Sequence, residues 1–237
     1  MIKDDMQYLT IALPKGKLFY LAKDLFAKVG FVADNLEEKS RKLVIINEEL
    51  KLKFIIAKTA DVPTYVEHGA ADIGVIGKDV LMEAQKDVYE LLDLGFGRCH
   101  LMMAVPKDKK RAKLTDYTHT RVATKFPNVA KQFFTSKGMQ MEYIKMNGSI
   151  ELGPIVGLSE SIVDIVETGT TLRENNLEEI AFIAEASARL IANRASFKLK
   201  FDRISKLVKA LEMELEGLMN KWKFKSKRIR LRSNTKN

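Results

Sequence analysis

The residues whose types and spacing could do chemistry gather first in a short loop in the second half of the chain. The apolar segment 162–166 is typical of a strand, and it leads directly into Glu167-Thr-Gly-Thr-Thr171, after which a helical segment begins. A glycine among hydroxyl-bearing residues lets successive backbone N–H groups turn toward one anion, and the threonine hydroxyls add donors. Asp164, inside the strand, can accept hydrogen bonds from ribose hydroxyls. The loop predicts a phosphate-binding site, with an ordinary threonine-rich turn as the alternative.

Three further segments place charged groups beside glycines at the ends of predicted strands. Lys15-Gly-Lys17 follows the first strand, and two ammonium groups around a glycine at a helix start suit a polyanion. Asp72 and Asp79 flank the glycine-rich segment 73–77, where carboxylates could hold a ribose, an adenine or hydrated Mg²⁺. Glu151 ends a segment that contains an amide and a glycine. Solvated turns, glycine packing and helix capping remain the alternatives for these segments.

The net charge of the chain is concentrated in its last residues. The 237 residues carry a formal charge of +9, and the segment 217–237 holds eight lysines and arginines but no acid, which leaves +1 for residues 1–216. A nearly neutral body argues against a nucleic-acid-binding protein. The basic tail is expected to be solvated and mobile, with weak nucleic-acid or acidic-partner contact as the alternative.

Several classes of protein are excluded by what the sequence lacks. The single cysteine, Cys99, cannot form an internal disulfide and fits a reducing compartment. The three histidines have no metal-ligand spacing, which argues against a zinc site. No Walker-type loop or Ser-His-Asp order is present, and no apolar run reaches the roughly 18 residues of a membrane span. Residues 1–10 are polar and do not resemble a signal peptide, so we expect a cytoplasmic protein without membrane contact.

Strand-like and helix-like segments alternate along the chain, which predicts an α/β fold. The expected strands are 8–13, 43–46, 52–57, 72–77, 101–105, 121–124, 141–144, 162–166 and 180–184. The expected helices are 18–29, 61–69, a segment from 79, 128–138 and 201–215.

The predicted organisation is two lobes and a tail. Lobe I comprises residues 1–98 and 176–216, lobe II comprises 99–175 with the threonine-rich loop, and 217–237 is a disordered basic tail. The last predicted strand and helix are expected to complete lobe I. Ligands of such open sheets bind at the carboxyl ends of strands, where the loops described above lie.

Together, these segments resemble the short form of ATP phosphoribosyltransferase. The matching stretches are collinear over about residues 8–215, and they are 13–18, 61–81, 121–128, 148–151 and 163–177. The resemblance implies a fold of two α/β lobes like those of type II periplasmic binding proteins, with the active site in the cleft between the lobes. Such a collinear set is far more specific than any single loop.

The resemblance also implies roles residue by residue. Asp164 would bind the ribose hydroxyls of phosphoribosyl pyrophosphate, and the loop after it would hold the 5-phosphate. The implied donor-binding residues are Asp164, Glu167, Thr168, Gly169, Thr170 and Thr171. The implied ATP- and pyrophosphate-binding residues are Lys15, Gly16, Lys17, Asp72 and Glu151. The family usually has arginine where this chain has Lys17 and Lys58, and lysine keeps the charge but loses the bidentate fork.

The implied reaction is attack of N1 of ATP on C1 of the donor, giving N1-(5-phospho-β-D-ribosyl)-ATP and pyrophosphate in the first step of histidine biosynthesis. Mg²⁺ would enter with the substrates, and no resident metal site or general base is assigned. A histidyl-tRNA-synthetase-like regulatory subunit and a homodimeric core are implied as partners, so the isolated chain is expected to be poorly active. The competing prediction is a two-lobed small-molecule or nucleotide-binding module without catalysis.

Overall fold

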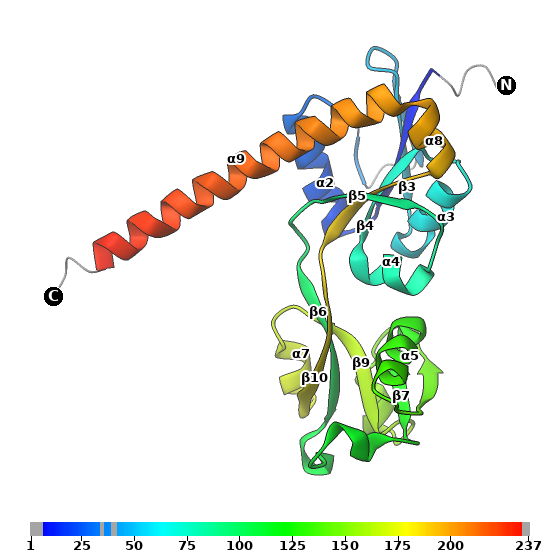
Figure 1. The fold of residues 1–237 in the computed structure, drawn as a ribbon, viewed down its shortest axis with the longest axis vertical. Helices are drawn as coiled ribbons and strands as arrows, with labels where there is room; N and C mark the ends of the chain where they lie inside the picture. Colours follow the sequence, from blue (N-terminus) through cyan, green and yellow to red (C-terminus); the bar gives the residue numbers. More distant parts are fainter. Residues whose placement is uncertain (1–6, 34–35, 39–41, 234–237) are drawn as a thin grey trace. The chain divides into compact units, whose positions relative to one another are not determined.

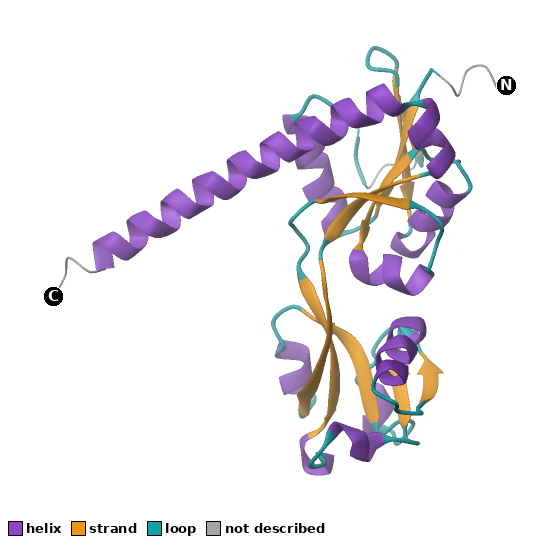
Figure 2. Ribbon diagram, in the orientation of Figure 1, coloured by secondary structure: helices purple, strands orange, loops and turns teal. Residues whose placement is uncertain are grey.

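The computed structural model describes residues 7–33, 36–38 and 42–233 (Figure 1). Helices and strands alternate along the chain, as Figure 2 shows, and form an α/β fold. The chain divides into two compact units, each with its own sheet. Unit 1 comprises Met1–Ile76, Lys86–Phe96 and Ala188–Asn237, and unit 2 comprises Gly77–Gln85 and Gly97–Ser187.

The described residues of unit 1 form a six-stranded sheet with the order β2-β3-β1-β4-β11-β5. Its strands are β1 (Leu9–Pro14), β2 (Val44–Asn47), β3 (Leu52–Ala57), β4 (Ile73–Gly77), β5 (Tyr89–Asp93) and β11 (Ala188–Ala192). β1 lies between β3 and β4 and is parallel to both, whereas β2 pairs with β3 and β5 with β11 in antiparallel fashion. The carboxyl ends of β1, β3 and β4 therefore lie at one edge of the sheet, where the Lys15–Lys17 loop begins.

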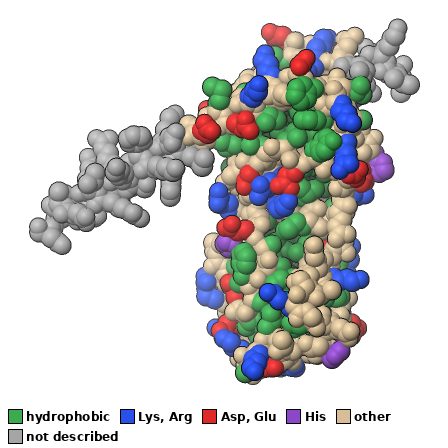
Figure 3. Space-filling view, in the orientation of Figure 1, with side chains coloured by type: hydrophobic (Ala, Val, Ile, Leu, Met, Phe, Trp, Pro, Cys, Tyr) green, Lys and Arg blue, Asp and Glu red, His purple; other side chains and the backbone are tan. Residues whose placement is uncertain are grey.

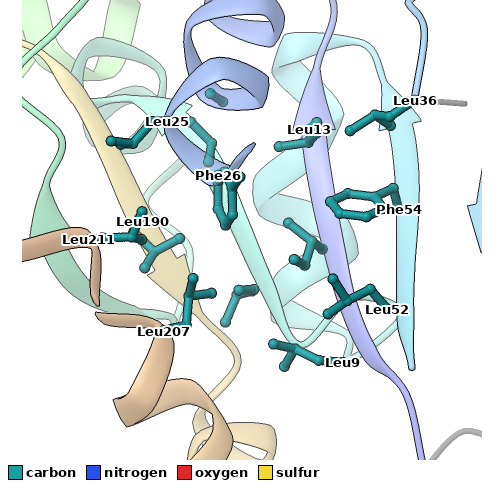
Figure 4. Packing of buried hydrophobic residues seen from close by; sticks show 14 of the residues in the cluster. Leu9, Leu13, Leu25, Phe26, Leu36, Leu52, Phe54, Leu190, Leu207 and Leu211 are labelled. Carbon is teal, nitrogen blue, oxygen red and sulfur yellow. The ribbon is translucent and has the colours of Figure 1, made fainter. Parts of the chain in front are cut away.

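Helices packed on this sheet build the core of unit 1. They are α2 (Lys17–Lys28), α3 (Val62–Glu67), α8 (Arg194–Leu199) and α9 (Phe201–Ser233), with a 3₁₀ turn at Thr59–Asp61. α2 buries an apolar stripe that includes Phe19 and Phe26, because apolar residues recur at helical spacing. Figure 4 shows Phe26 packed with Leu207 and Leu211 from α9. Burial of each such side chain contributes about 1.5–3 kcal/mol, so this core holds the sheet edge in place.

The described residues of unit 2 form a five-stranded sheet with the order β10-β6-β9-β7-β8. Its strands are β6 (Cys99–Pro106), β7 (Arg121–Thr124), β8 (Glu142–Lys145), β9 (Ser161–Val166) and β10 (Leu177–Ala186). β9 is antiparallel to β6 and parallel to β7. This interior position explains the apolar run of β9, because both of its faces need cover.

The helices of unit 2 are short. They are α4 (Lys78–Ala84), α5 (Pro127–Ser136), α6 (Leu152–Ile155) and α7 (Thr170–Glu174), with 3₁₀ turns at Lys107–Lys109 and Leu114–Tyr117. Pro127 stands in the first turn of α5, where its missing N–H costs no hydrogen bond. α7 directly follows β9, so the threonine-rich loop is a strand-to-helix connection at the carboxyl edge of the sheet.

The units differ from the predicted lobes at three places. β10 pairs with β6 in unit 2, so the chain returns to unit 1 at Ala188 and not at residue 176. The strand that completes unit 1 is β11, which together with β5 was not expected. α4 belongs to unit 2 although the prediction placed it in lobe I. The segment 180–184 was predicted as a strand, but its partner β6 lies far away in the sequence, so the unit to which it belongs could not be read locally.

The C-terminal segment also differs from its prediction. α9 continues to Ser233, through most of the tail that was expected to be disordered, whereas residues 234–237 lie outside the described part (Figure 1). Lysine, arginine and leucine favour helix, and no proline interrupts them. Charges of both signs are interspersed on the face seen in Figure 3, as expected of a nearly neutral body. A search of the described residues for a helix long and apolar enough to cross a membrane found none.

Candidate functional site

The loop after β9 lines a cavity of about 260 Å³ in unit 2. The lining residues are Glu151, Asp164, Ile165, Val166, Glu167, Thr168, Gly169, Thr170, Thr171 and Leu172. All six residues predicted to bind the donor are among them. A strand end, a strand-to-helix loop and the start of α7 thus meet around one space, at the edge of the sheet where ligands of α/β proteins bind.

The backbone of the loop depends on Gly169. Its φ of 70° lies in the left-handed region, where a side chain would be strained, and it stands immediately before α7. A Cβ at this position would also lie 3.0 Å from Nη1 of Arg173 and 3.2 Å from Oε1 of Glu179. Gly169 is the N-cap residue of α7 and has no side chain with which to cap it. The N–H groups at the start of a helix suit an anion.

The threonine hydroxyls of the loop form a short chain. Oγ1 of Thr168 and Oγ1 of Thr170 are 3.2 Å apart, and either can be the donor. Nη2 of Arg173 donates to Oγ1 of Thr170 at 3.1 Å. A guanidinium only donates, so the Thr170 oxygen accepts in that bond and its own proton remains for another oxygen. The loop is thereby rich in donors that face an anion.

Asp164 supplies a partly buried carboxylate to the same cavity. It stands on β9 opposite Met102 of β6, and its Oδ1 accepts a hydrogen bond from the N–H of Ile165 at 2.8 Å. The pKa of Asp164 is raised to about 6, mainly by burial and also by the charge of Glu151, while the Ile165 N–H and Lys125 act to lower it. A carboxylate held at such a cost in desolvation is typical of a functional site.

The raised pKa of Asp164 gives a pH-dependent stability. This carboxyl ionises near pH 4 in the unfolded chain and near pH 6 in the folded protein. The free energy of unfolding therefore decreases as the pH rises between these two values. We expect Asp164→Asn to stabilise the protein at pH 8 by about 1–2 kcal/mol, after allowance for partial exposure, and by nearly nothing at pH 4. Urea unfolding at both pH values measures this difference. An equal effect at pH 4 and pH 8 would contradict it.

The Lys15–Lys17 loop lies in unit 1 at the end of β1. Gly16 has a φ of 87° and precedes α2, whose N-terminus it leaves open to an acceptor. That acceptor is Glu38, whose Oε1 lies 2.6 Å from the Gly16 N–H. A hydrogen bond from the Tyr20 hydroxyl to Glu38 raises the pKa of Tyr20. The structure thus places a carboxylate, to which the Gly16 N–H donates, where a polyanion was predicted.

Comparisons with known proteins decide the family. The family described as ATP phosphoribosyltransferase (HisG) matches residues 58–213. An ATP phosphoribosyltransferase of Citrifermentans bemidjiense is 51% identical over 209 residues, which cover 88% of this chain and 99% of that protein. One from Thermoanaerobacter sp. (strain X514) is 54% identical over 211 residues, with 89% and 98% covered. The chain belongs to the ATP phosphoribosyltransferase family.

A solved structure agrees with this membership. It is the ATP phosphoribosyl transferase (HisG:HisZ) complex from Thermotoga maritima, in which one chain is 33% identical to this one with a TM-score of 0.76. The match covers 88% of this chain and 99% of that chain, as expected of the short form of ATP phosphoribosyltransferase. The family reaction transfers the phosphoribosyl group of phosphoribosyl pyrophosphate to N1 of ATP, in the first step of histidine biosynthesis.

Two more distant structures show the fold alone. The structure of Tv2483 bound to L-arginine has a TM-score of 0.54 at 12% identity, and covers 93% of this chain and 88% of its own. The substrate binding protein of an amino acid ABC transporter has a TM-score of 0.56 at 13% identity, with 91% and 98% covered. The predicted fold class, a two-lobed α/β protein like type II periplasmic binding proteins, is confirmed for this ATP phosphoribosyltransferase.

Asp72 is not placed where a nucleotide-binding residue of an ATP phosphoribosyltransferase was expected. Its side chain is 6% exposed, and Oδ2 accepts from Nζ of Lys200 at 2.7 Å and from the N–H of Thr10 at 2.7 Å. Asp72 precedes β4, whereas the Lys15–Lys17 loop lies at the carboxyl edge of the parallel strands, roughly 15 Å away along a five-residue strand. These contacts support a structural role for Asp72, and its binding of ATP or pyrophosphate stays a prediction.

Glu151 lies in unit 2 and lines the same cavity as Asp164 and the threonine-rich loop. The prediction grouped it with Lys15 to Lys17, which belong to unit 1. Its effect on the pKa of Asp164 also places it beside the expected ribose site. Glu151 is therefore grouped with the cavity of the threonine-rich loop.

Three residues of these sites were not singled out from the sequence. They are Arg173, Glu38 and Lys200, which contact Thr170, Gly16 and Asp72 respectively. The contact between Arg173 and Thr170 could have been predicted from the sequence, because positions i and i+3 of a helix lie on the same face. The contacts of Glu38 and Lys200 join residues 22 and 128 positions apart, which no local pattern reveals.

Metal binding by the protein alone has no support among the side chains that the structure describes. No group of three or more histidine, cysteine, aspartate or glutamate side chains in those residues could hold an ion. The carboxylates of the cavity are hard oxygen ligands of the kind that suits Mg²⁺.

Proposed function

We propose that the cavity of unit 2 binds the phosphoribosyl donor of the family reaction. The observation that supports this proposal is the convergence of Asp164 and the whole loop 167–171 on one cavity. The 5-phosphate accepts hydrogen bonds from the N–H groups at the start of α7 and from the threonine hydroxyls. The carboxylate of Asp164 accepts hydrogen bonds from the ribose hydroxyls. Gly169 permits the loop to turn its N–H groups inward.

The proposed geometry accounts for how the donor is activated. N1 of adenine forms a bond to C1 of the ribose while the bond from C1 to the pyrophosphate oxygen breaks, so positive charge develops at C1. The ionised carboxylate of Asp164, held through the ribose hydroxyls, stabilises that charge. The 5-phosphate contacts hold the sugar in line for displacement. No residue is assigned as a general base.

For the loop Lys15–Lys17, we propose binding of pyrophosphate or the ATP phosphates. Two exposed lysines and the Gly16 N–H at the start of α2 provide charge and a directed donor. Glu38 accepts from the Gly16 N–H in the substrate-free chain, so a phosphate oxygen replaces it on binding. Lys58 follows β3, whose register pairs Ala57 with Pro14, and adds an exposed cation at the same edge.

Replacement of Glu38 tests the assignment of this loop. We expect Glu38→Gln to tighten the binding of inorganic pyrophosphate about three- to tenfold, because a carboxylate no longer competes for the Gly16 N–H or repels the ligand. Calorimetry with pyrophosphate on the full chain measures the affinity. Glu37→Gln, a neighbouring exposed acid, is the matched control and should leave the affinity unchanged. Unchanged or weaker binding by Glu38→Gln would contradict displacement of this carboxylate.

Mg²⁺ is proposed to enter as part of the substrates. It neutralises the pyrophosphate group of the donor and eases its departure. The carboxylates of Glu151 and Glu167, which line the cavity, can accept hydrogen bonds from the water shell of the ion.

We further propose a regulatory partner of the HisZ type and a homodimeric core. The similarity to a chain of the HisG:HisZ complex supports the first. Since ATP and sugar phosphates are intracellular metabolites, a cytoplasmic location accompanies the proposal.

The decisive assay mixes ATP, phosphoribosyl pyrophosphate and Mg²⁺ with the full chain, and follows N1-phosphoribosyl-ATP by its absorbance. We expect slow product formation by the chain alone and faster formation with a HisZ-type subunit. Full activity without any partner would overturn the regulatory proposal. Binding of both substrates without product under either condition would favour the non-catalytic binding module, which at present rests on the fold alone.

A further inference from the structure

The donor cavity presents an electrostatic problem. Its lining includes three acids, Glu151, Asp164 and Glu167, and none of the residues described as lining it is a lysine or arginine. The proposed ligand carries a phosphate at one end and pyrophosphate at the other. Mg²⁺ offsets the charge at the pyrophosphate end, so the 5-phosphate end requires a cation or strongly oriented donors from the protein.

Arg173 is a cation that contacts this loop directly. It stands three residues after Thr170 on α7, so the two side chains share a helix face. Nη2 donates to Oγ1 of Thr170 at 3.1 Å. Nη1 would lie 3.0 Å from a Cβ on Gly169, so the guanidinium packs against the glycine face of the loop. Arg173 thus contacts the loop but is not among the residues that line the cavity.

The hydrogen bond from Arg173 sets the direction of the threonine hydroxyls. A hydroxyl has one proton and two lone pairs, and Arg173 occupies one lone pair of Thr170. The proton of Thr170 then points either to a ligand or to Thr168, 3.2 Å away, whose own proton is in that case released toward a ligand. In both arrangements one hydroxyl of the pair donates outward. A charged donor at the end of such a chain also strengthens the bonds that follow it.

We propose that Arg173 is a positioning residue for the phosphoribosyl donor: it orients the Thr170 and Thr168 hydroxyls as donors to the 5-phosphate. This inference rests on the proposed function of the cavity and deepens it. Arg173 acts through Thr170 and does not itself contact the donor. Its guanidinium also adds positive charge beneath a loop whose cavity is lined by carboxylates.

A double-mutant cycle tests this inference on the full chain with its regulatory subunit. The variants are Arg173→Gln, Thr170→Val and the combination of both, because valine keeps the shape of threonine without its hydroxyl. We expect each single variant to raise the KM for phosphoribosyl pyrophosphate about tenfold, with kcat and the KM for ATP within about twofold of the wild type. The donor KM of the double variant should not exceed that of Thr170→Val alone, because without the Thr170 hydroxyl the side chain at position 173 has no group to orient.

Two controls keep the outcome interpretable. Lys137→Gln removes an exposed cation just after the end of α5, in the same unit, and should leave every constant unchanged. Arg173→Lys retains a donor and the charge, so it should recover part of the donor affinity. Calorimetry with ribose 5-phosphate gives the same ranking without turnover.

Each other outcome overturns the inference. An unchanged donor KM in Arg173→Gln excludes a positioning role, and effects that multiply in the double variant indicate direct action of the charge instead. If Thr170→Val and Asp164→Ala both leave the donor KM unchanged, the proposed function of the cavity fails and the role of Arg173 fails with it. A donor KM that rises in those two variants but not in Arg173→Gln separates the two failures.

Discussion

Asp164→Ala is expected to raise the KM for phosphoribosyl pyrophosphate about 100-fold while the KM for ATP changes less than about threefold. The reason is the partly buried carboxylate, which accepts the ribose hydroxyls in the proposed complex. Hydrogen bonds to a charged group contribute about 1.5–3 kcal/mol each, and the variant loses them only for the sugar donor. Initial rates measured with each substrate varied in turn, with the regulatory subunit present, give both constants.

Asp164→Asn separates the charge from the shape of the side chain. The amide still accepts a hydrogen bond, so we expect an intermediate rise in the donor KM of about tenfold. In the wild type the donor KM should also rise as the pH falls through about 6, where the carboxyl becomes protonated, and Asp164→Asn should abolish this dependence. Glu174→Gln, an exposed acid on α7 outside the cavity lining, is the matched control. Equal effects of Asp164→Ala on both substrates would contradict the assignment.

Asp164 also links function to stability. A carboxylate whose pKa is raised to about 6 by burial is ionised, and therefore unfavourably desolvated, at neutral pH. The protein retains this carboxylate although the Asp164→Asn variant, whose amide has the same shape, is expected to be more stable at neutral pH. Such a cost is typical of a site that is built for a ligand, because the ribose hydroxyls restore the hydrogen bonds that burial removed.

The donor loop was predictable from sequence because its signal is local. An apolar run predicts the strand, the glycine predicts a positive φ, and the hydroxyls follow within five residues. The structure has each of these features in β9, Gly169 and the lining of the cavity. The Lys15–Lys17 loop was found in the same way, since β1 and α2 flank it closely.

The features that sequence reasoning missed depend on distant parts of the chain. β5 and β11 form an antiparallel pair, and all strands of the second sheet lie between them in the sequence. The local sequence of either strand therefore does not indicate its partner. β10 was assigned to the wrong unit because its sequence, with exposed glutamates, does not indicate that it pairs with β6. Asp72 was predicted to bind the nucleotide because its carboxylate flanks a glycine-rich segment at a predicted strand. Its partner Lys200 lies 128 residues away.

The ion pair of Asp72 leads to the largest expected effect on stability. Asp72 and Lys200 form an ion pair whose side chains are 6% and 11% exposed, and the same carboxylate accepts the N–H of Thr10. Asp72→Ala leaves an ammonium and an N–H group without this acceptor in the interior of unit 1. We expect a loss of about 3–5 kcal/mol in the free energy of unfolding, measured by urea denaturation.

A second variant shows whether the cost comes from the unpaired charge. Asp72→Leu combined with Lys200→Met removes both charges, so it should lose far less than the sum of the two single changes. Asp24→Ala, at an exposed position of α2, is the control and should change stability little. Asp72→Asn should keep the wild-type KM for ATP, because this carboxylate links Lys200, between α8 and α9, to Thr10 of β1. A specific rise in that KM without a loss of stability would restore the nucleotide-binding assignment.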